Sequence, residues 1–140
     1  AAFALVDAGV RELVVANRTA ARARSLVDAL GAPALACAWE ALRREPGFDL
    51  VVNATSAGHA GHPFAWPLAD LVPTACYDLS YGAVARPFLA AARNYGMRST
   101  HDGLGMLVEQ AAESFECWHG VHPDTAPVHA ELRALLDERG

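Results

Sequence analysis

The sequence has few cysteines, no long apolar run and no excess of positive charge. Its three cysteines, Cys37, Cys76 and Cys117, are odd in number and too far apart for a CxxC pair, so we expect free thiols in a reducing, cytoplasmic setting. No segment approaches the roughly 18 apolar residues of a membrane helix. The net charge of −5 disfavours a nucleic-acid partner. These absences argue against secreted, membrane-spanning and nucleic-acid-binding proteins.

Metal-ligand patterns and a targeting signal are absent as well. The pairs His59/His62 and His119/His122 have no cysteine or carboxylate at ligand spacing beside them, so we predict no metal site. The first residues carry no Lys or Arg of a signal peptide. Hydrophobic residues make up 53% of the 140, which excludes a disordered chain and suggests surface that is normally buried against something else.

Short apolar runs alternate along the chain with segments of helical periodicity. Five runs predict strands, at residues 12–16, 33–36, 49–53, 75–79 and 97–100. Segments between and after them predict helices, at residues 19–31, 39–44, 87–95, 103–118 and 124–137. This alternation predicts an α/β fold, a Rossmann-like doubly wound parallel sheet. Ligands of such sheets bind at the carboxyl ends of the strands, so the residues after each strand are the candidates for function.

Two arginines follow the first predicted strand. An NAD-binding Rossmann domain has an acidic residue here for the ribose 2′-hydroxyl, whereas this chain has Asn17, Arg18, Thr19 and Arg22. Arg18 and Arg22 can converge on one dianion at the start of a helix, which suits the 2′-phosphate of NADP. The alternative is a helix cap with two solvated arginines.

Small and polar residues follow the later strands. Thr55 and Ser56 lie before Gly58 in a Gly- and Pro-rich loop at residues 54–67. Small residues there allow the backbone to approach a ligand closely. The alternative is an ordinary Asx or Ser/Thr turn. Met106 and Gln110 share one face of the helix that opens at Gly103. We expect that face to lie away from an apolar one formed by Leu104, Leu107, Val108, Ala111 and Phe115.

Four motifs occur in order along the chain. They are Asn17-Arg18-Thr19-x-x-Arg22, Asn53-Ala54-Thr55-Ser56-x-Gly58, Tyr77-Asp78-x-x-Tyr81 and Asp102-Gly103-Leu104-Gly105-Met106-Leu107-Val108-x-Gln110-Ala111. Together they resemble the C-terminal, NADP-binding half of shikimate dehydrogenase, and the resemblance covers essentially the whole chain. The family catalyses reversible hydride transfer between NADPH and 3-dehydroshikimate, which gives shikimate for aromatic amino acid biosynthesis.

The resemblance implies a role for eleven residues. Asn17, Arg18, Thr19 and Arg22 would hold the adenosine ribose and its 2′-phosphate, Thr55 and Ser56 would line the cofactor cleft, and Leu79, Gly103 and Met106 would contact the nicotinamide end. Tyr81 and Gln110 would reach the bound shikimate or 3-dehydroshikimate. No catalytic residue is assigned within the chain, because the family's Lys and Asp for proton transfer lie in its N-terminal substrate domain.

The chain departs from the family in two large respects. The first strand of this domain with its Gly-rich loop is absent, and so is the N-terminal substrate domain. Residues 1–8 look like the end of a helix, so we expect residues 1–140 to be a partial NADP-binding domain from a longer protein, a monomer or homodimer. We expect the helices of residues 103–140 to pack back toward the substrate domain. Without the central first strand, the strands at 12–16 and 49–53 would leave a gap between them, so the piece is not expected to fold stably alone.

Two other functions fit the same residues. A quinate/shikimate dehydrogenase that uses NAD shares the fold, but the arginine pair favours NADP. A non-catalytic NADP-binding module fits a chain whose nearest acid or base candidates, Asp78 and His101, have no partner at evident spacing.

Overall fold

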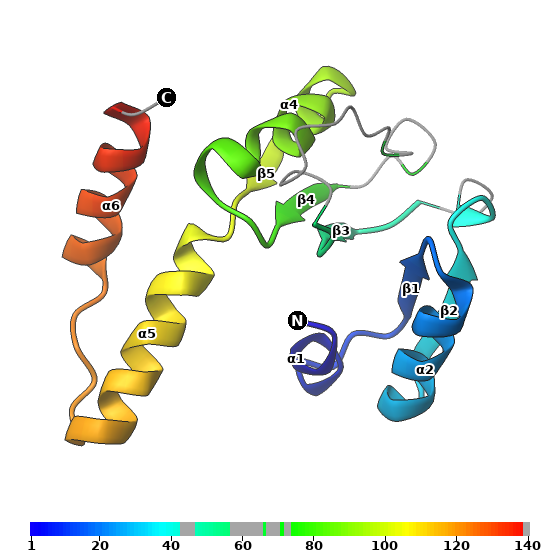
Figure 1. Ribbon diagram of the computed structural model, residues 1–140, viewed down its shortest axis with the longest axis horizontal. Coiled ribbons are helices and arrows are strands. Elements are labelled where there is room, and N and C mark those ends of the chain that lie inside the picture. Colours follow the sequence, from blue (N-terminus) through cyan, green and yellow to red (C-terminus); the bar gives the residue numbers. More distant parts are fainter. Residues whose placement is uncertain (43–46, 57–65, 67–70, 72–73, 139–140) are drawn as a thin grey trace. The chain divides into compact units, whose positions relative to one another are not determined.

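The computed structural model describes residues 1–42, 47–56, 66, 71 and 74–138 (Figure 1). The chain divides into two compact units, Ala1–Pro46 and Gly47–Gly140, and each is described by itself. Over the described ranges, none of the helices combines the length and the apolar character that crossing a membrane requires.

The first unit is a two-stranded parallel sheet with two helices. Its elements are α1 (Ala2–Asp7), β1 (Leu13–Asn17), α2 (Ala20–Leu30) and β2 (Ala34–Ala38). β1 and β2 pair in parallel, from Leu13 opposite Ala34 to Asn17 opposite Ala38, with α2 as the crossover. The predicted helix boundaries are confirmed: Thr19 is the N-cap in an extended conformation, and Gly31 ends the helix at a φ of 71°, which favours glycine.

The second unit holds a three-stranded parallel sheet and the longer helices. Its elements are β3 (Leu50–Asn53), β4 (Ala75–Asp78), the 3₁₀ turn η3 (Gly82–Val84), α4 (Arg86–Asn94), β5 (Ser99–His101), α5 (Leu104–His119) and α6 (Ala126–Glu138). The strand order is β3-β4-β5, with every pair parallel. The parallel strands and crossover helices confirm the predicted α/β, Rossmann-like class, although η3 was not predicted.

The core of this unit lies between the sheet and α4. Buried Phe88, Leu89 and Ala92 of α4 pack with Cys76 of β4 and with Met97. Burial raises the pKa of the Cys76 thiol to about 11, so it stays neutral and serves as a small apolar core residue. This core fixes the position of β4, whose carboxyl end leads directly into the candidate residues Leu79 and Tyr81.

The structure corrects several details of the prediction. The run at 12–16 is not a buried strand, because Leu13–Ala16 of β1 are only half-buried. Of the expected helix at 39–44, residues 39–41 form a turn and Leu42 is in a 3₁₀ turn, whereas residues 43–46 lie outside the described part. Residues 57–65, with Gly58, His59 and His62, lie outside it as well. Within the described part of each unit, β1 pairs with β2, and β3 pairs with β4.

The buried face of α5 also differs from the expected one. Leu104, Val108 and Ala112 are its buried residues, whereas Leu107 is 39% exposed and Phe115 is 43% exposed. Leu107, Ala111 and Phe115 line a shallow apolar hollow between α5 and α6 together with buried Val108 and Ala112. The apolar stripe of the sequence is therefore broader than the face that is buried.

Candidate functional site

The end of β1 presents two arginines beside the start of α2. The side-chain oxygen of Asn17 accepts a hydrogen bond from the Thr19 N–H at 2.8 Å, which fixes the turn between strand and helix. The Thr19 hydroxyl makes no cap hydrogen bond, and the first turn of α2 contains no acidic residue. Arg18 and Arg22 are exposed, and no ion-pair partner for either is found in the described part of the chain. The turn thus combines two unneutralised guanidinium groups with the positive end of a helix, which is suited to a dianion.

A buried polar pair joins the carboxyl ends of β3 and β4. Asp78 is 1% exposed, and its carboxylate accepts hydrogen bonds from the Asn53 side-chain amide at 2.9 Å and from the Ser80 N–H at 2.8 Å. The Asn53 oxygen in turn accepts from the backbone N–H and the hydroxyl of Thr55, at 3.1 and 2.8 Å. This network fixes the backbone that leads to Thr55 and Ser80. Ser56 is exposed beside it.

The sequence predicts both Asn53 and Asp78 at strand ends, and it offers Asp78 only as an acid or base candidate. Their position as the last residue of each of two strands is the available signal, because register places Asn53 opposite Asp78 in neighbouring parallel strands. The pair is a support for the site rather than a reactive group.

Leu79 and Gly103 come together at the end of β4. The Leu79 N–H donates to the Asn53 carbonyl at 3.0 Å, and the Gly103 N–H donates to the Ser80 carbonyl at 2.8 Å. A Cβ on Gly103 would lie 2.7 Å from the Leu79 carbonyl carbon and closer still to its oxygen. Only glycine therefore allows the start of α5 to approach the strand end this closely.

The remaining predicted residues lie on or near α5. Met106 and Gln110 are both exposed and stand one turn apart, away from buried Leu104 and Val108. Tyr81 is exposed in part and lines a small apolar hollow of about 180 Å³ with leucines of α5 and α6. The structure thus brings Leu79 and Gly103 into contact, keeps Met106 and Gln110 on one face, and sets Tyr81 against α6.

An ion pair connects the start of α5 to α6. Arg133 donates to Asp102 through both terminal nitrogens, at 2.8 and 2.6 Å, and the Leu104 N–H donates to the same carboxylate at 3.2 Å. Partial burial acts to raise the pKa of Asp102, but the hydrogen bonds and charge of Arg133 and the hydrogen bond from Leu104 outweigh it and lower this pKa. The pKa of Arg133 is raised, chiefly by its hydrogen bonds to Asp102.

The lowered pKa of Asp102 predicts a pH-dependent contribution to stability. An acid whose pKa is lower in the folded state than in the unfolded state stabilises the folded protein. This contribution is complete at a pH above the unfolded-state pKa, near 4, and is lost as the pH falls through the folded-state pKa. Because Arg133 is 38% exposed, we expect Asp102→Asn to lower the free energy of unfolding by only about 1 kcal/mol at neutral pH. Urea unfolding of both proteins should show this difference shrinking below about pH 4; a difference that grows there would contradict the assignment.

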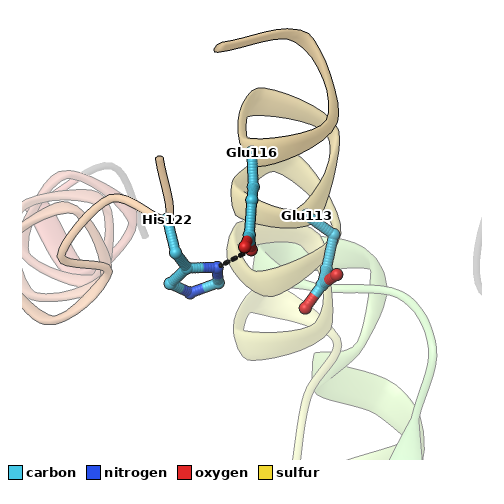
Figure 2. A group of neighbouring side chains, drawn as sticks. All are labelled: Glu113, Glu116 and His122. Carbon is cyan, nitrogen blue, oxygen red and sulfur yellow. Dashed lines mark hydrogen bonds and ion pairs between the residues drawn. The ribbon is translucent and has the colours of Figure 1, made fainter. Parts of the chain in front are cut away.

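A group of exposed polar residues lies near the end of α5. His122 bonds Glu116 through Nδ1 at 2.8 Å, and Glu113 lies one turn earlier on the helix (Figure 2). This corrects the expectation that no carboxylate is near His122. The ion pair and the i,i+3 spacing of the glutamates account for the grouping, since exposed acidic side chains commonly gather in this way.

Parallel strands that end in polar residues and lead into helices define this chain as a Rossmann-like α/β protein. Residues 103–133 match the family described as "Shikimate 5'-dehydrogenase C-terminal domain". The chain is 54% identical over 134 residues to an NADP(+) shikimate dehydrogenase of Stenotrophomonas maltophilia, covering 93% of the chain and 48% of that protein.

Solved structures agree with this match. An Ael1 enzyme from Pseudomonas putida has a TM-score of 0.83 at 43% identity, over 94% of this chain and 49% of that one. A Thermus thermophilus shikimate 5-dehydrogenase, solved with NADP(H) and shikimate, has a TM-score of 0.71 at 33% identity, over 95% and 49%. The chain therefore spans about half the length of these relatives, and its residues 103–133 resemble the C-terminal domain of the shikimate dehydrogenases.

Proposed function

We propose that the chain is the cofactor-binding half of an NADP-dependent shikimate dehydrogenase, which interconverts 3-dehydroshikimate and shikimate. The observation that carries this proposal is the similarity, over 95% of the chain, to an enzyme whose structure contains both NADP(H) and shikimate. The relatives that carry this activity in their names are about twice as long as this chain, so the proposed activity belongs to the whole protein.

The arginine turn is the local support for NADP. A 2′-phosphate is a dianion, and Arg18 and Arg22 are exposed cations at a helix start free of acidic residues. Asn17 and Thr19 complete this adenosine end, while Thr55, Ser56, Leu79, Gly103 and Met106 form the proposed remainder of the cofactor site.

When bound, NADPH supplies the hydride, and the residues of this chain bind and orient the reactants. Tyr81 and Gln110 are the proposed shikimate contacts. The proton-transfer groups are assigned to a substrate domain outside this chain, toward which the helices of residues 103–140 pack. We place the protein in the cytoplasm as a monomer or homodimer; in the part of the chain that the structure describes, Cys37, Cys76 and Cys117 form no disulfide, which suits a reducing compartment.

The decisive assay uses the full gene product that contains the chain. We expect shikimate to reduce NADP⁺, followed by NADPH absorbance, with much weaker turnover of quinate or of NAD⁺. Preference for quinate with NAD⁺ would favour a quinate/shikimate dehydrogenase. NADPH binding without turnover of either substrate would favour a non-catalytic module.

The strand pairing predicts the folding behaviour of residues 1–140 alone. Among the residues that the structure describes, β1 pairs with β2 and β3 pairs with β4, so each of these two strands leaves one edge of backbone groups unpaired. We expect the isolated piece to lack a single cooperative unfolding transition in circular dichroism or calorimetry, whereas the full gene product has one. A sharp transition of the isolated piece at low protein concentration would refute this expectation.

A further inference from the structure

The carboxylate of Asp102 gathers three segments of the second unit. It accepts two hydrogen bonds from Arg133 of α6 and one from the Leu104 N–H at the start of α5. The backbone of Gly82, in η3, also acts to lower the pKa of Asp102, which indicates that it lies beside this carboxylate. The Asp102 side chain is only 8% exposed, so this set of bonds is shielded from water on the acid's side. One side chain thus ties together η3, α5 and α6.

A second contact joins α6 to the same segment. A Cβ on Gly82, whose φ is 59°, would lie 3.1 Å from Cδ2 of Leu136, one turn beyond Arg133 on α6. Leu136 also lines the hollow that Tyr81 borders. Helix α6 therefore supports the Tyr81–Gly82 segment from two sides: through Arg133 and the Asp102 carboxylate, and through direct packing of Leu136.

We propose that Arg133 is a positioning residue for the substrate end of the site. By holding Asp102 it fixes two neighbouring points at once, the Tyr81–Gly82 segment and the Gly103–Leu104 start of α5. This inference rests on the proposed function, which places shikimate at Tyr81 and the nicotinamide at Gly103. Arg133 itself touches neither ligand; it acts through Asp102 and the backbone of Gly82 and Leu104.

A planar guanidinium that binds one carboxylate through two nitrogens defines an orientation as well as a distance. Glutamine at position 133 would keep much of the side-chain length and lose the charge and the paired donors. Lysine would keep the charge but not the two-point geometry. The two variants therefore separate attraction from orientation.

The test uses Arg133→Gln and Arg133→Lys in the full gene product, with Arg98→Gln as the matched control. Arg98 is exposed and directly precedes β5, whereas Asp102 directly follows that strand. A small misplacement of reacting groups is costly, so we expect Arg133→Gln to lower kcat/KM for shikimate on the order of 10- to 100-fold. The KM for NADP⁺ should change less than about threefold, because its 2′-phosphate binds elsewhere. Arg133→Lys should recover part of the loss, and Arg98→Gln should match the parent.

Amide NMR of the same proteins supplies a readout independent of catalysis. We expect Arg133→Gln to shift the Gly82, Gly103 and Leu104 amides and to leave those of residues 17–22 in place. Parent-like kinetics of Arg133→Gln in a less stable protein would overturn the positioning role, as would unmoved Gly82 and Gly103 amides. If Arg133→Gln does not fold, parent-like kinetics and amides of Arg133→Lys would overturn it. An inactive parent protein would instead refute the proposed function, and the amide shifts would still test the positioning role.

Discussion

Replacing both Arg18 and Arg22 with leucine should weaken NADPH binding on the order of 100- to 1,000-fold and change NADH binding little. Each hydrogen bond from a guanidinium to a charged partner contributes about 1.5–3 kcal/mol, and because both arginines are exposed to water, the loss of two bonds at the lower end of that range gives an effect of this size. NADH has a hydroxyl where NADPH has the 2′-phosphate, and it gives the arginines no dianion to bind. Fluorescence titration of the full gene product with each cofactor measures the two affinities.

A matched control for this double variant exists in the same unit. Arg11 and Arg24 are also exposed arginines. Arg11 precedes β1, at the end of the strand opposite Asn17, and Arg24 lies in the second turn of α2. Their double replacement with leucine makes the same change in net charge and should leave NADPH binding within about threefold of the parent, because only screened long-range charge is lost. Equal losses for NADPH and NADH in the Arg18/Arg22 variant would refute the 2′-phosphate assignment.

Gly103→Ala should be among the most damaging single substitutions in the second unit. Its methyl group would meet the Leu79 carbonyl, with the carbon at 2.7 Å and the oxygen closer, and both partners are backbone that cannot rotate away. Forced overpacking costs about 1–3 kcal/mol and occasionally more, and a collision with backbone belongs at the upper end. We therefore expect a loss of about 3 kcal/mol or more in the free energy of unfolding, together with loss of cofactor binding at the nicotinamide end.

Gly105→Ala is the control for this substitution. A Cβ there has only the His129 side chain near, at 4.0 Å, and the position lies within helix α5. Alanine in such a helix position is favoured over glycine by roughly 0.5–1 kcal/mol, so this variant should be as stable as the parent or more so. Urea unfolding of both variants checks the pair. A Gly103→Ala protein of parental stability would show that α5 can move away from β4 without cost.

The sequence predicts the elements of this fold better than it predicts their faces. Apolar runs and caps located β1 to β5 and the helices from α2 onward because these signals are local. Burial is not local: Leu107 and Phe115 belong to the apolar stripe of α5, yet they remain partly exposed where α5 faces α6, whereas Leu104, Val108 and Ala112 are buried. The half-buried state of β1 likewise depends on what covers it, which periodicity does not specify.

The candidate site shows the same division between features that local sequence predicts and features that it does not. Side chains that meet a ligand directly, such as Arg18 and Arg22, follow strand ends and are found by inspecting those positions. Supports are harder to find, because Asp102 and Arg133 are 31 residues apart and nothing in their local sequence joins them. Asn53 and Asp78 become a pair only through the register of β3 and β4. Long-range partners of this kind require the three-dimensional arrangement.

In the part of the chain that the structure describes, β1 and β3 each pair on one side, and this has a consequence for handling the protein in solution. An edge strand offers a row of unsatisfied amides and carbonyls to any other chain that can extend beside it. Among the described strands, β3 is short and carries Val51 and Val52, with no charged residue within Leu50–Asn53 to discourage such pairing. Concentrated solutions of residues 1–140 alone should therefore form intermolecular sheets, visible as growing light scattering and thioflavin binding, and a lysine placed at Val52 should delay both.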